Sequence, residues 1–320
     1  MKIKPFRLER YYTLYEHSAK YSLCNSDCEA MTIKDLLALE NGAEEQFHNL
    51  WLGYTETNGH PALRRDISAI YSKITAEQMT VCTGAQEPIF LFSHAVLNSG
   101  DEVIVQTPCY QSLQSVPESI GCKTLSWNVK YEGNRPTFDI DDLKKLVNNK
   151  TKVIYLNAPH NPTGFLFTKA EQQAIVEIAR ANNIIIFCDE VYRELEHSPK
   201  FAIPAFADAY ENGVSVGVMS KSYGLPGLRI GWMVAPESFV EDAFKTGNDH
   251  LESIEYGLYN IHIQNFNSFY FAVVTHGVFD SAYKGKLESE LFDFAEKHLT
   301  KNNPKNLSSK LSEYFNYDNN

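Results

Sequence analysis

Between residues 79 and 235 the chain alternates short apolar runs with longer segments in which apolar residues recur every three or four positions. Short runs rich in valine and isoleucine are typical of buried strands, and the longer spacing is typical of helices that cover a sheet. The pattern predicts an α/β fold in which helices lie on both faces of a mostly parallel central sheet. The predicted strands are 79–82, 102–106, 152–158, 183–189, 214–219 and 231–235. The predicted helices lie near 86–98, 109–120, 138–148 and 168–182.

The last of these helices has the clearest boundary signal. Thr168 and Glu171 have the spacing of a capping box, in which each side chain accepts a hydrogen bond from the other residue's backbone N–H. The apolar residues that share one face of this helix, and that we expect to pack on the sheet, are Ala174, Ile175, Ile178 and Ala179.

The two ends of the chain differ from this regular middle part. Residues 1–45 are interpreted as an N-terminal arm with a first helix at 32–39, and residues 46–240 as the large domain. After about residue 240, Asn, Phe, Tyr and Lys become frequent and the apolar periodicity weakens. We therefore interpret 241–320 as a divergent C-terminal segment.

Charge and hydropathy narrow the range of partners. The formal net charge is −11 at pH 7 and the pI is near 5.4, whereas nucleic acids and anionic membranes bind clustered Lys and Arg. The chain contains no run of about 18 apolar residues that could span a bilayer, and its first residues lack the apolar stretch of a signal peptide. We expect a cytoplasmic protein that binds small molecules, not nucleic acid or a membrane.

The six cysteines predict neither disulfides nor a metal site. Cys24 and Cys28 are close in sequence, but no second pair of Cys or His residues with zinc-ligand spacing accompanies them. We expect reduced thiols, several of them on buried strands.

Lys221 is the first candidate for chemistry. It lies in VMSKSYGLPGLRIGW (218–232), directly after a predicted buried strand and inside a turn rich in glycine and proline. A lysine in a loop is usually a solvated charge, but a partly desolvated amine favours reaction with an aldehyde. Arg229, eight positions on, can bind a phosphate through two parallel hydrogen bonds.

A second motif, TGAQEPIF (83–90), predicts a tight turn from a strand into a helix. Gly84 and Ala85 end the strand, and Pro88 falls in the first turn of the helix. Small residues let backbone N–H groups approach an anion, and a helix N-terminus favours negative charge. Most turns of this kind bind no ligand, so the motif by itself is weak evidence.

Three polar residues that follow predicted strands complete the set. Tyr110 is either a core tyrosine or a ring that lies on a flat heteroaromatic group. Asn161 lies in NAPHNPTG (157–164), where two prolines and a glycine fix an irregular turn. Asp189, in CDEVY, ends a buried strand, where a carboxylate either caps a helix or needs a cationic partner such as a protonated pyridine nitrogen.

Together these motifs resemble the class I/II aminotransferases of fold type I, which depend on pyridoxal 5'-phosphate (PLP). The branch with N-x-P-x-N-P-T-G and S-K-x-x-x-x-P-G-x-R-I-G is matched, and the match covers roughly residues 30–240 in the family's motif order. The resemblance implies that Lys221 forms an aldimine with PLP and that Asp189 keeps the pyridine nitrogen protonated. It also implies that Asn161 and Tyr192 bind the phenolate oxygen.

The resemblance extends to the rest of the cofactor site. Tyr110 resembles the family's stacking aromatic residue. Tyr54, in GYTETNGHPALR, resembles the tyrosine that reaches the phosphate of the neighbouring subunit, so the resemblance implies a homodimer with shared active sites. The family resemblance also implies a small α+β domain built from both termini. The residues that resemble the phosphate cup are Gly84, Ala85, Gln86, Ser220 and Arg229.

Two departures from the family pattern stand out. Val218 occupies a position where the family often has Ser or Thr for the phosphate, and Ser220 or Ser222 are possible replacements. The family also has a C-terminal arginine that binds the substrate α-carboxylate, yet Arg229 is the last arginine of this 320-residue chain. The substitutes for that role are Arg7, Arg10 and Lys245.

The predicted activity is transfer of an amino group between an amino acid and a 2-oxo acid, and it is expected to be weak if the carboxylate is poorly bound. Fold type I lyases and cyclising synthases share all these motifs, so elimination or cyclisation is one alternative. A non-catalytic protein that keeps the PLP fold is the other.

Overall fold

The structure is a computed structural model. The residues that it describes are 3–16, 18–21, 23–237 and 239, and the strand backbone at 253–256, 259–266 and 269–276. The chain divides into two units, Met1–Ala243 and Phe244–Asn320.

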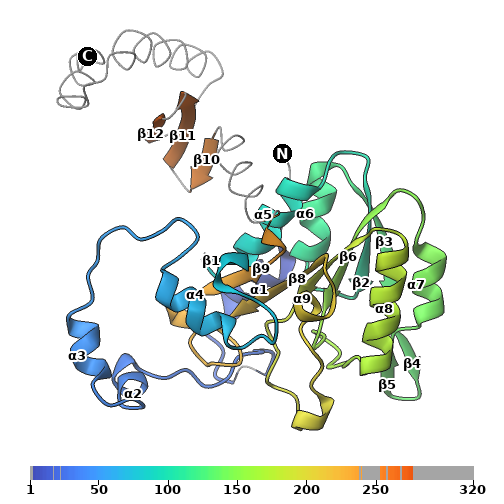
Figure 1. The fold of residues 1–320 in the computed structure, drawn as a ribbon, viewed down its shortest axis with the longest axis horizontal. Coiled ribbons are helices and arrows are strands. Elements are labelled where there is room, and N and C mark those ends of the chain that lie inside the picture. Colours follow the sequence, from blue (N-terminus) through green and yellow to red (C-terminus); the bar gives the residue numbers. More distant parts are fainter. Residues whose placement is uncertain are drawn as a thin grey trace. The chain divides into compact units, whose positions relative to one another are not determined.

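The first unit is built on a seven-stranded sheet with the order β1-β9-β8-β7-β6-β2-β3 (Figure 1). β9 runs antiparallel to its neighbours β1 and β8, and the other adjacent strands are parallel. The predicted mostly parallel sheet is therefore confirmed. The strands are β1 (Met79–Cys82), β2 (Glu102–Thr107), β3 (Lys123–Asn128), β6 (Thr151–Asn157), β7 (Ile185–Asp189), β8 (Gly213–Val218) and β9 (Gly231–Val234).

Helices cover both faces of this sheet, as predicted. Ile104, Ile154 and Ile186 pack in one apolar cluster with residues of α7 and α8. On the opposite face Phe92 of α5 packs against the rings of Tyr155 and Phe187, because successive strand residues point to opposite sides. The helices of this part are α4 (Pro61–Ser68), α5 (Gln86–Val96), α6 (Ser112–Ile120), α7 (Ile140–Leu146), α8 (Lys169–Ala181) and α9 (Phe206–Ala209).

The capping box predicted for α8 is present. The Glu171 N–H donates to Thr168 Oγ1 (3.2 Å) and the Thr168 N–H donates to Glu171 Oε2 (2.7 Å). Of the predicted sheet-facing residues, Ile175 and Ala179 are buried. Local sequence signals thus place this helix correctly.

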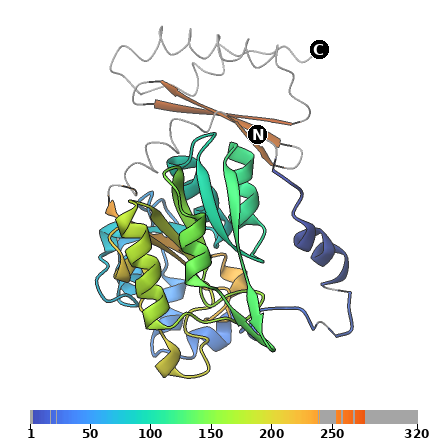
Figure 2. The same ribbon diagram turned by 90° about the vertical axis from the view of Figure 1, so that its right-hand side faces the viewer.

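The N-terminal arm has no core of its own. Helices α1 (Arg7–Tyr15), α2 (Ile33–Leu37) and α3 (Ala43–His48) contain no buried side chain. Figure 2 shows the dark-blue helix α1 beside the body of the unit. The remaining short elements are the hairpin β4 (Lys130–Glu132) and β5 (Arg135–Thr137), and single turns at Ala76–Gln78, Pro199–Phe201 and Pro226–Leu228.

The second unit contains an antiparallel three-stranded sheet with the order β10-β11-β12. Its strands are β10 (Ser253–Tyr256), β11 (Tyr259–Phe266) and β12 (Phe269–His276). The weak periodicity of this segment did not predict them. Within the described parts of both units, no helix is long and apolar enough to cross a membrane.

Candidate active site

The sheet brings the predicted site residues to one edge. Gly84 follows β1, Tyr110 follows β2, Asn161 follows β6, Asp189 ends β7 and Lys221 follows β8. These strands run parallel to one another, so their carboxyl ends meet at the same edge, which is where α/β sheets place ligands.

Asp189 is a buried carboxylate with few partners. Its side chain is 4% exposed, and its Oδ1 accepts a hydrogen bond from the Val191 N–H (3.2 Å). Burial raises the pKa of Asp189 to about 6, and the nearby positive charge of Lys221 opposes that rise. A cation buried beside this carboxylate would therefore stabilise its ionised form.

A chain of hydrogen bonds links the loop after β6, the turn after β7 and the N-terminal arm. Asn161 Nδ2 donates to the Tyr192 hydroxyl (3.2 Å), and that hydroxyl donates to Ser26 Oγ (2.9 Å). Lys221 Nζ donates to the same Ser26 oxygen (3.2 Å) and lies 5.8 Å from the centre of the Tyr192 ring. The structure thus brings Asn161, Tyr192 and Lys221 together, with a serine from the N-terminal arm between them.

Lys221 has a charged partner from the same arm. Its Nζ forms an ion pair with Asp27 Oδ1, and the two side chains are 23% and 33% exposed. The amine is thus partly shielded from water and faces an acidic group from a distant part of the sequence.

The turn after β1 meets Arg229. Gly84 has a left-handed backbone with φ of +78°, and a Cβ at this position would lie 2.6 Å from Arg229 Nη2. The left-handed backbone favours glycine here, and a side chain would also displace the guanidinium from its place against the turn. The guanidinium therefore lies at the turn that leads into α5, whose N-terminus adds a favourable field for an anion.

Tyr110 lies between the sheet edge and the arm. Gln86 Nε2 donates to the Tyr110 hydroxyl (3.0 Å), which donates to Glu9 Oε1 (2.9 Å). The Tyr110 ring packs at 4.9 Å from the ring of Phe6. Burial raises the pKa of Tyr110 well above its usual range, with Glu9 and Asp189 acting in the same direction, so the phenol stays protonated at neutral pH.

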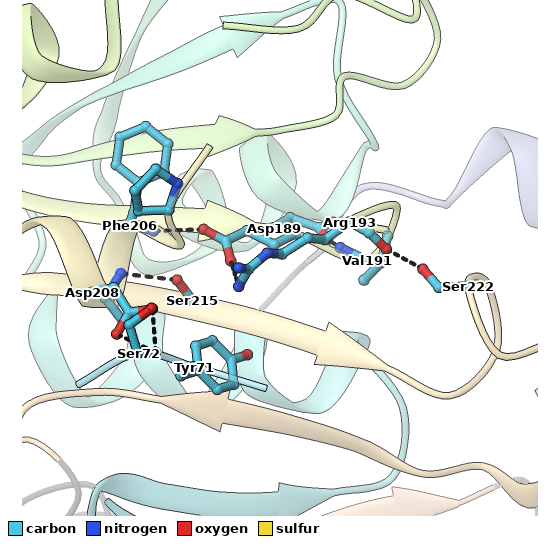
Figure 3. A network of polar contacts seen from close by, with 12 residues as sticks. Tyr71, Ser72, Asp189, Val191, Arg193, Phe206, Asp208, Ser215 and Ser222 are labelled. Carbon is cyan, nitrogen blue, oxygen red and sulfur yellow. Dashed lines mark hydrogen bonds and ion pairs between the residues drawn. The ribbon is translucent and has the colours of Figure 1, made fainter. Parts of the chain in front are cut away.

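The loop that carries Lys221 is tied to a buried polar network (Figure 3). The Ser222 hydroxyl donates to the backbone oxygen of Arg193, so it is not placed to serve the phosphate. Arg193 Nη1 lies 4.0 Å from Glu190 Oε2, and Glu190 Oε1 accepts from the Phe206 N–H (2.7 Å). Burial raises the pKa of Glu190 to about 7, and Arg193 opposes the rise. The network fixes the Lys221 loop against β7.

Other predicted residues occupy less direct positions. The Tyr54 side chain is 100% exposed, so within one chain it packs against no part of the site. Ser220 and Val218 are buried, Ala85 caps α5, and Gln86 begins that helix. Arg7 and Arg10 are exposed residues of α1, and Lys245 lies outside the described residues.

Three contributors were missed by sequence reasoning. Asn157, at the end of β6, accepts from the Asn161 N–H (2.6 Å) and donates to the Asp189 backbone oxygen (2.8 Å), so it ties the two loops together. Its position as a buried polar residue at a strand end was the available signal. Ser26 and Asp27 carried no such signal.

An open cleft of about 240 Å³ adjoins the site. Its wall includes Ser26, Asn161 and Tyr192, and its one described carboxylate is Glu196. Burial lowers the pKa of His160, which also lines it, to about 4, so that ring is neutral at pH 7. The described wall of the cleft thus contains one carboxylate, two histidines and no Lys or Arg side chain.

Among the described residues no group of three or more His, Cys, Asp or Glu side chains is arranged to hold a metal ion. Cys24 and Cys28 are exposed, and none of the six cysteines forms a disulfide.

Comparison with known protein families gives a match over most of the chain. The model of the aminotransferase class I and II family matches residues 20–254. The arginine–pyruvate transaminase of Pseudomonas aeruginosa is 32% identical over 192 residues, which are 57% of this chain and 48% of that protein. The capreomycidine synthase of Streptomyces vinaceus is 28% identical over 238 residues, which are 73% of this chain and 59% of that protein. The chain spans about half the length of the curated relatives it matches.

Solved structures show the same similarity. A PLP-dependent aminotransferase from Streptococcus suis has a TM-score of 0.71 and 30% identity, over 77% of this chain and 66% of that chain. The PLP-dependent cyclase OrfR has a TM-score of 0.68 and 27% identity, over 78% of this chain and 65% of that chain.

Proposed function

Because this chain belongs to the aminotransferase class I and II family, whose cofactor is PLP, we propose that it transfers an amino group between an amino acid and a 2-oxo acid, with the cofactor attached to Lys221. The observation that carries this proposal is the placement of a buried carboxylate, Asp189, and a partly shielded amine, Lys221, at the same edge of the sheet, where the positive charge of Lys221 acts to lower the pKa of that carboxylate.

The residues present fit the phosphate of PLP. A phosphate dianion needs a cation and several N–H donors, and Arg229 together with the N-terminus of α5 would supply them. Glycine at position 84 leaves the backbone bare beside the Arg229 guanidinium, so the backbone and the guanidinium could approach the same anion. Ser220 is buried at the same loop and remains the candidate hydroxyl, since Ser222 is engaged elsewhere.

The residues also fit the ring. Asp189 would hold the pyridine nitrogen protonated, because a buried carboxylate with a raised pKa gains most from a cation beside it. Asn161 and Tyr192, already joined to each other, would donate to the phenolate oxygen. Tyr110 would cover one face of the ring.

PLP, when bound, supplies an electron sink for the bond that breaks at the donor Cα. Lys221 Nζ takes the Cα proton as a general base and later returns it. Asn161 and Tyr192 orient the group, and Asp189 holds one proton on the ring nitrogen. The chain's own residues therefore bind, orient and move protons.

A homodimer with a shared site is part of the proposal. Segment 50–54 exposes Leu50, Trp51, Leu52 and Tyr54 in succession, and Leu52 is 90% exposed. A run of bare apolar and aromatic side chains is typical of a protein interface. Tyr54 would then reach the phosphate of the second copy. Light scattering tests this: a stable monomer with full PLP occupancy would refute the shared site.

Cyclisation is the second candidate reaction. Capreomycidine synthase matches a larger share of this chain than the transaminase named above, and OrfR is a PLP-dependent cyclase. Transamination and the proposed cyclisation would both start by loss of the Cα proton, so they share the residues described here.

The test is a donor screen with product analysis. PLP-loaded protein is incubated with arginine, aspartate and other amino acids, with and without pyruvate or 2-oxoglutarate, and the products are resolved by mass spectrometry. An oxo acid from the donor together with a newly aminated acceptor supports transamination. A dehydrated or cyclised donor with no need for an acceptor supports the second candidate, and no product from any donor contradicts both.

A further inference from the structure

We propose that Asp27 is a further catalytic residue: its carboxylate holds the charge on Lys221 Nζ when that amine carries the donor's Cα proton. This inference rests on the proposed function. The arm thus supplies an acidic counter-ion to the base, in addition to covering the site.

The contact involves the reacting atom itself. Lys221 Nζ pairs with Asp27 Oδ1 and donates to Ser26 Oγ at 3.2 Å, so two consecutive arm residues bind one nitrogen. Both charged side chains are about one quarter to one third exposed. Partial shielding strengthens the attraction relative to an ion pair in bulk water, whereas fully exposed pairs contribute little.

The arm is held on both sides of Asp27. The Tyr12 hydroxyl of α1 donates to the Cys24 backbone oxygen (2.9 Å) before it. After it, the Glu29 backbone oxygen passes so close to Gly224 that a Cβ there would lie 2.9 Å away. Gly224 follows Lys221 in the same loop and has a φ of +64°, so glycine suits both the backbone and the close approach. The packing therefore fixes the carboxylate next to the amine.

The proposed step balances without any further reagent. The donor's Cα–H bond would break and an N–H bond would form on Lys221 Nζ, while PLP, when bound, would supply the electron sink for the pair left at Cα. Asp27 stays ionised and gains no proton. Its negative charge compensates the positive charge that appears on the amine during the step.

The first experiment uses the protein without cofactor. Lysines are reductively methylated at pH 8 for a limited time, and Lys221 is compared with the exposed Lys169 on α8 by peptide mass spectrometry. Only the uncharged amine reacts. In Asp27→Asn, Lys221 labelling should be faster by about two- to fivefold relative to Lys169, because the ion pair that engages the amine is lost.

Matched variants separate charge from access. Ser26→Ala removes the neighbouring hydroxyl without changing charge, so Lys221 labelling should change less than twofold. Asp27→Glu should keep the slow labelling of the wild type, and Asp27→Ser, a second neutral variant, should label as fast as Asp27→Asn. Equal rates in the wild type and both neutral variants, or equally fast labelling in Ser26→Ala, would overturn the proposal.

The second experiment uses the PLP-loaded enzyme and a donor deuterated at Cα. Turnover in Asp27→Asn should fall about 10- to 100-fold, and the isotope effect on kcat should rise because proton removal limits the rate more. A purely structural role would slow both isotopologues equally.

The proposed function and the role of Asp27 can each be wrong without the other. If borohydride reduction leaves Lys221 unmodified, the proposed function is wrong, whereas the labelling comparison still tests the ion pair. If Lys221 carries the cofactor and Asp27→Asn turns over like the wild type, only the role of Asp27 is wrong.

Discussion

Two parts of the candidate site are held in place by different forces. One is the ring side, the strand-end residues that we propose face the ring of PLP, and the other is the N-terminal arm beside them. Asn157 and Asp189 are buried at neighbouring strand ends and paired in register, so the sheet core fixes their positions. The arm helices bury no side chain, and the arm reaches the body through polar contacts such as Lys4 Nζ with Glu118 Oε2 (2.6 Å) and Tyr110 with Glu9 (2.9 Å). The sheet therefore fixes the residues proposed to hold the cofactor, whereas the arm residues beside them depend partly on contacts that salt and pH weaken.

The largest effect is expected on the ring side. Asp189→Asn should reduce kcat by about 10²- to 10⁴-fold, the range typical for loss of a group that controls a proton in the reaction, because the ring nitrogen then lacks its counter-ion. The control is Asp208→Asn. Asp208 is equally buried, but it accepts from the Ser72 and Lys73 N–H groups, away from the site. That variant should lose melting temperature, with a much smaller fall in kcat than Asp189→Asn when both are assayed well below their melting temperatures, and near-native turnover in Asp189→Asn would remove Asp189 from the mechanism.

Substrate binding should be weak on the arm side. The described wall of the cleft holds a carboxylate, Glu196, and no planar arginine fork, and Asp27 lies beside the amine. Loss of such a fork costs on the order of 2–5 kcal/mol, about 30-fold to several thousand-fold in affinity. Steady-state kinetics should give high Michaelis constants for common α-amino acids. A donor with a micromolar constant and rapid turnover would reveal a carboxylate clamp elsewhere in the chain.

The pH dependence of stability sharpens the same comparison. Because burial raises the pKa of Asp189 from 3.8 to about 6, the folded cofactor-free protein holds a proton there that the unfolded chain releases. The stabilising contribution of this group is complete below pH 4 and is lost as the pH rises to about 6. Relative to the wild type, cofactor-free Asp189→Asn should therefore gain on the order of 1–3 kcal/mol of unfolding free energy between pH 4 and pH 7.

Denaturant titrations of both proteins at pH 4 and pH 7 measure that difference. The contribution of Glu190 to the pH dependence cancels in the comparison, because both proteins contain Glu190. PLP should reverse the order at pH 7, since the ring cation stabilises the ionised carboxylate. A pH-independent difference between the two proteins would show that Asp189 is not a buried acid with a raised pKa.

The smallest effect is expected at the edge of the arm. Glu9→Gln removes the charged acceptor of the Tyr110 hydroxyl but leaves a neutral one, so about 1 kcal/mol or less is at stake. The dissociation constant of PLP should rise no more than about fivefold, with kcat unchanged. A loss of kcat comparable to that of Asp189→Asn would mean that the arm also takes part in the reaction at the PLP ring.

The sequence predicts the sheet-borne half of the molecule well, because its signals are local. Apolar runs locate six of the strands, and Thr168 with Glu171 locates a helix start. Strand β3 is missed because its residues at Leu125 and Trp127 alternate with polar ones, as suits an edge strand that faces solvent.

The arm contacts follow from no local pattern. Asp27 and Lys221 are separated by 194 positions, and neither position alone predicts an ion pair. Asn157 was visible at a strand end, but its role depends on the register that places it opposite Asp189. Contacts that depend on register or on the path of a coreless segment require the three-dimensional structure.

The central claim is that Lys221 carries the cofactor, and one measurement tests it most directly. PLP-saturated protein is reduced with borohydride, digested and analysed by mass spectrometry. The account predicts a phosphopyridoxyl group on the Lys221 peptide in near-stoichiometric yield, with Lys221→Arg as the unlabelled control. Recovery of an unmodified Lys221 peptide from saturated protein, or labelling of a different lysine, would contradict it.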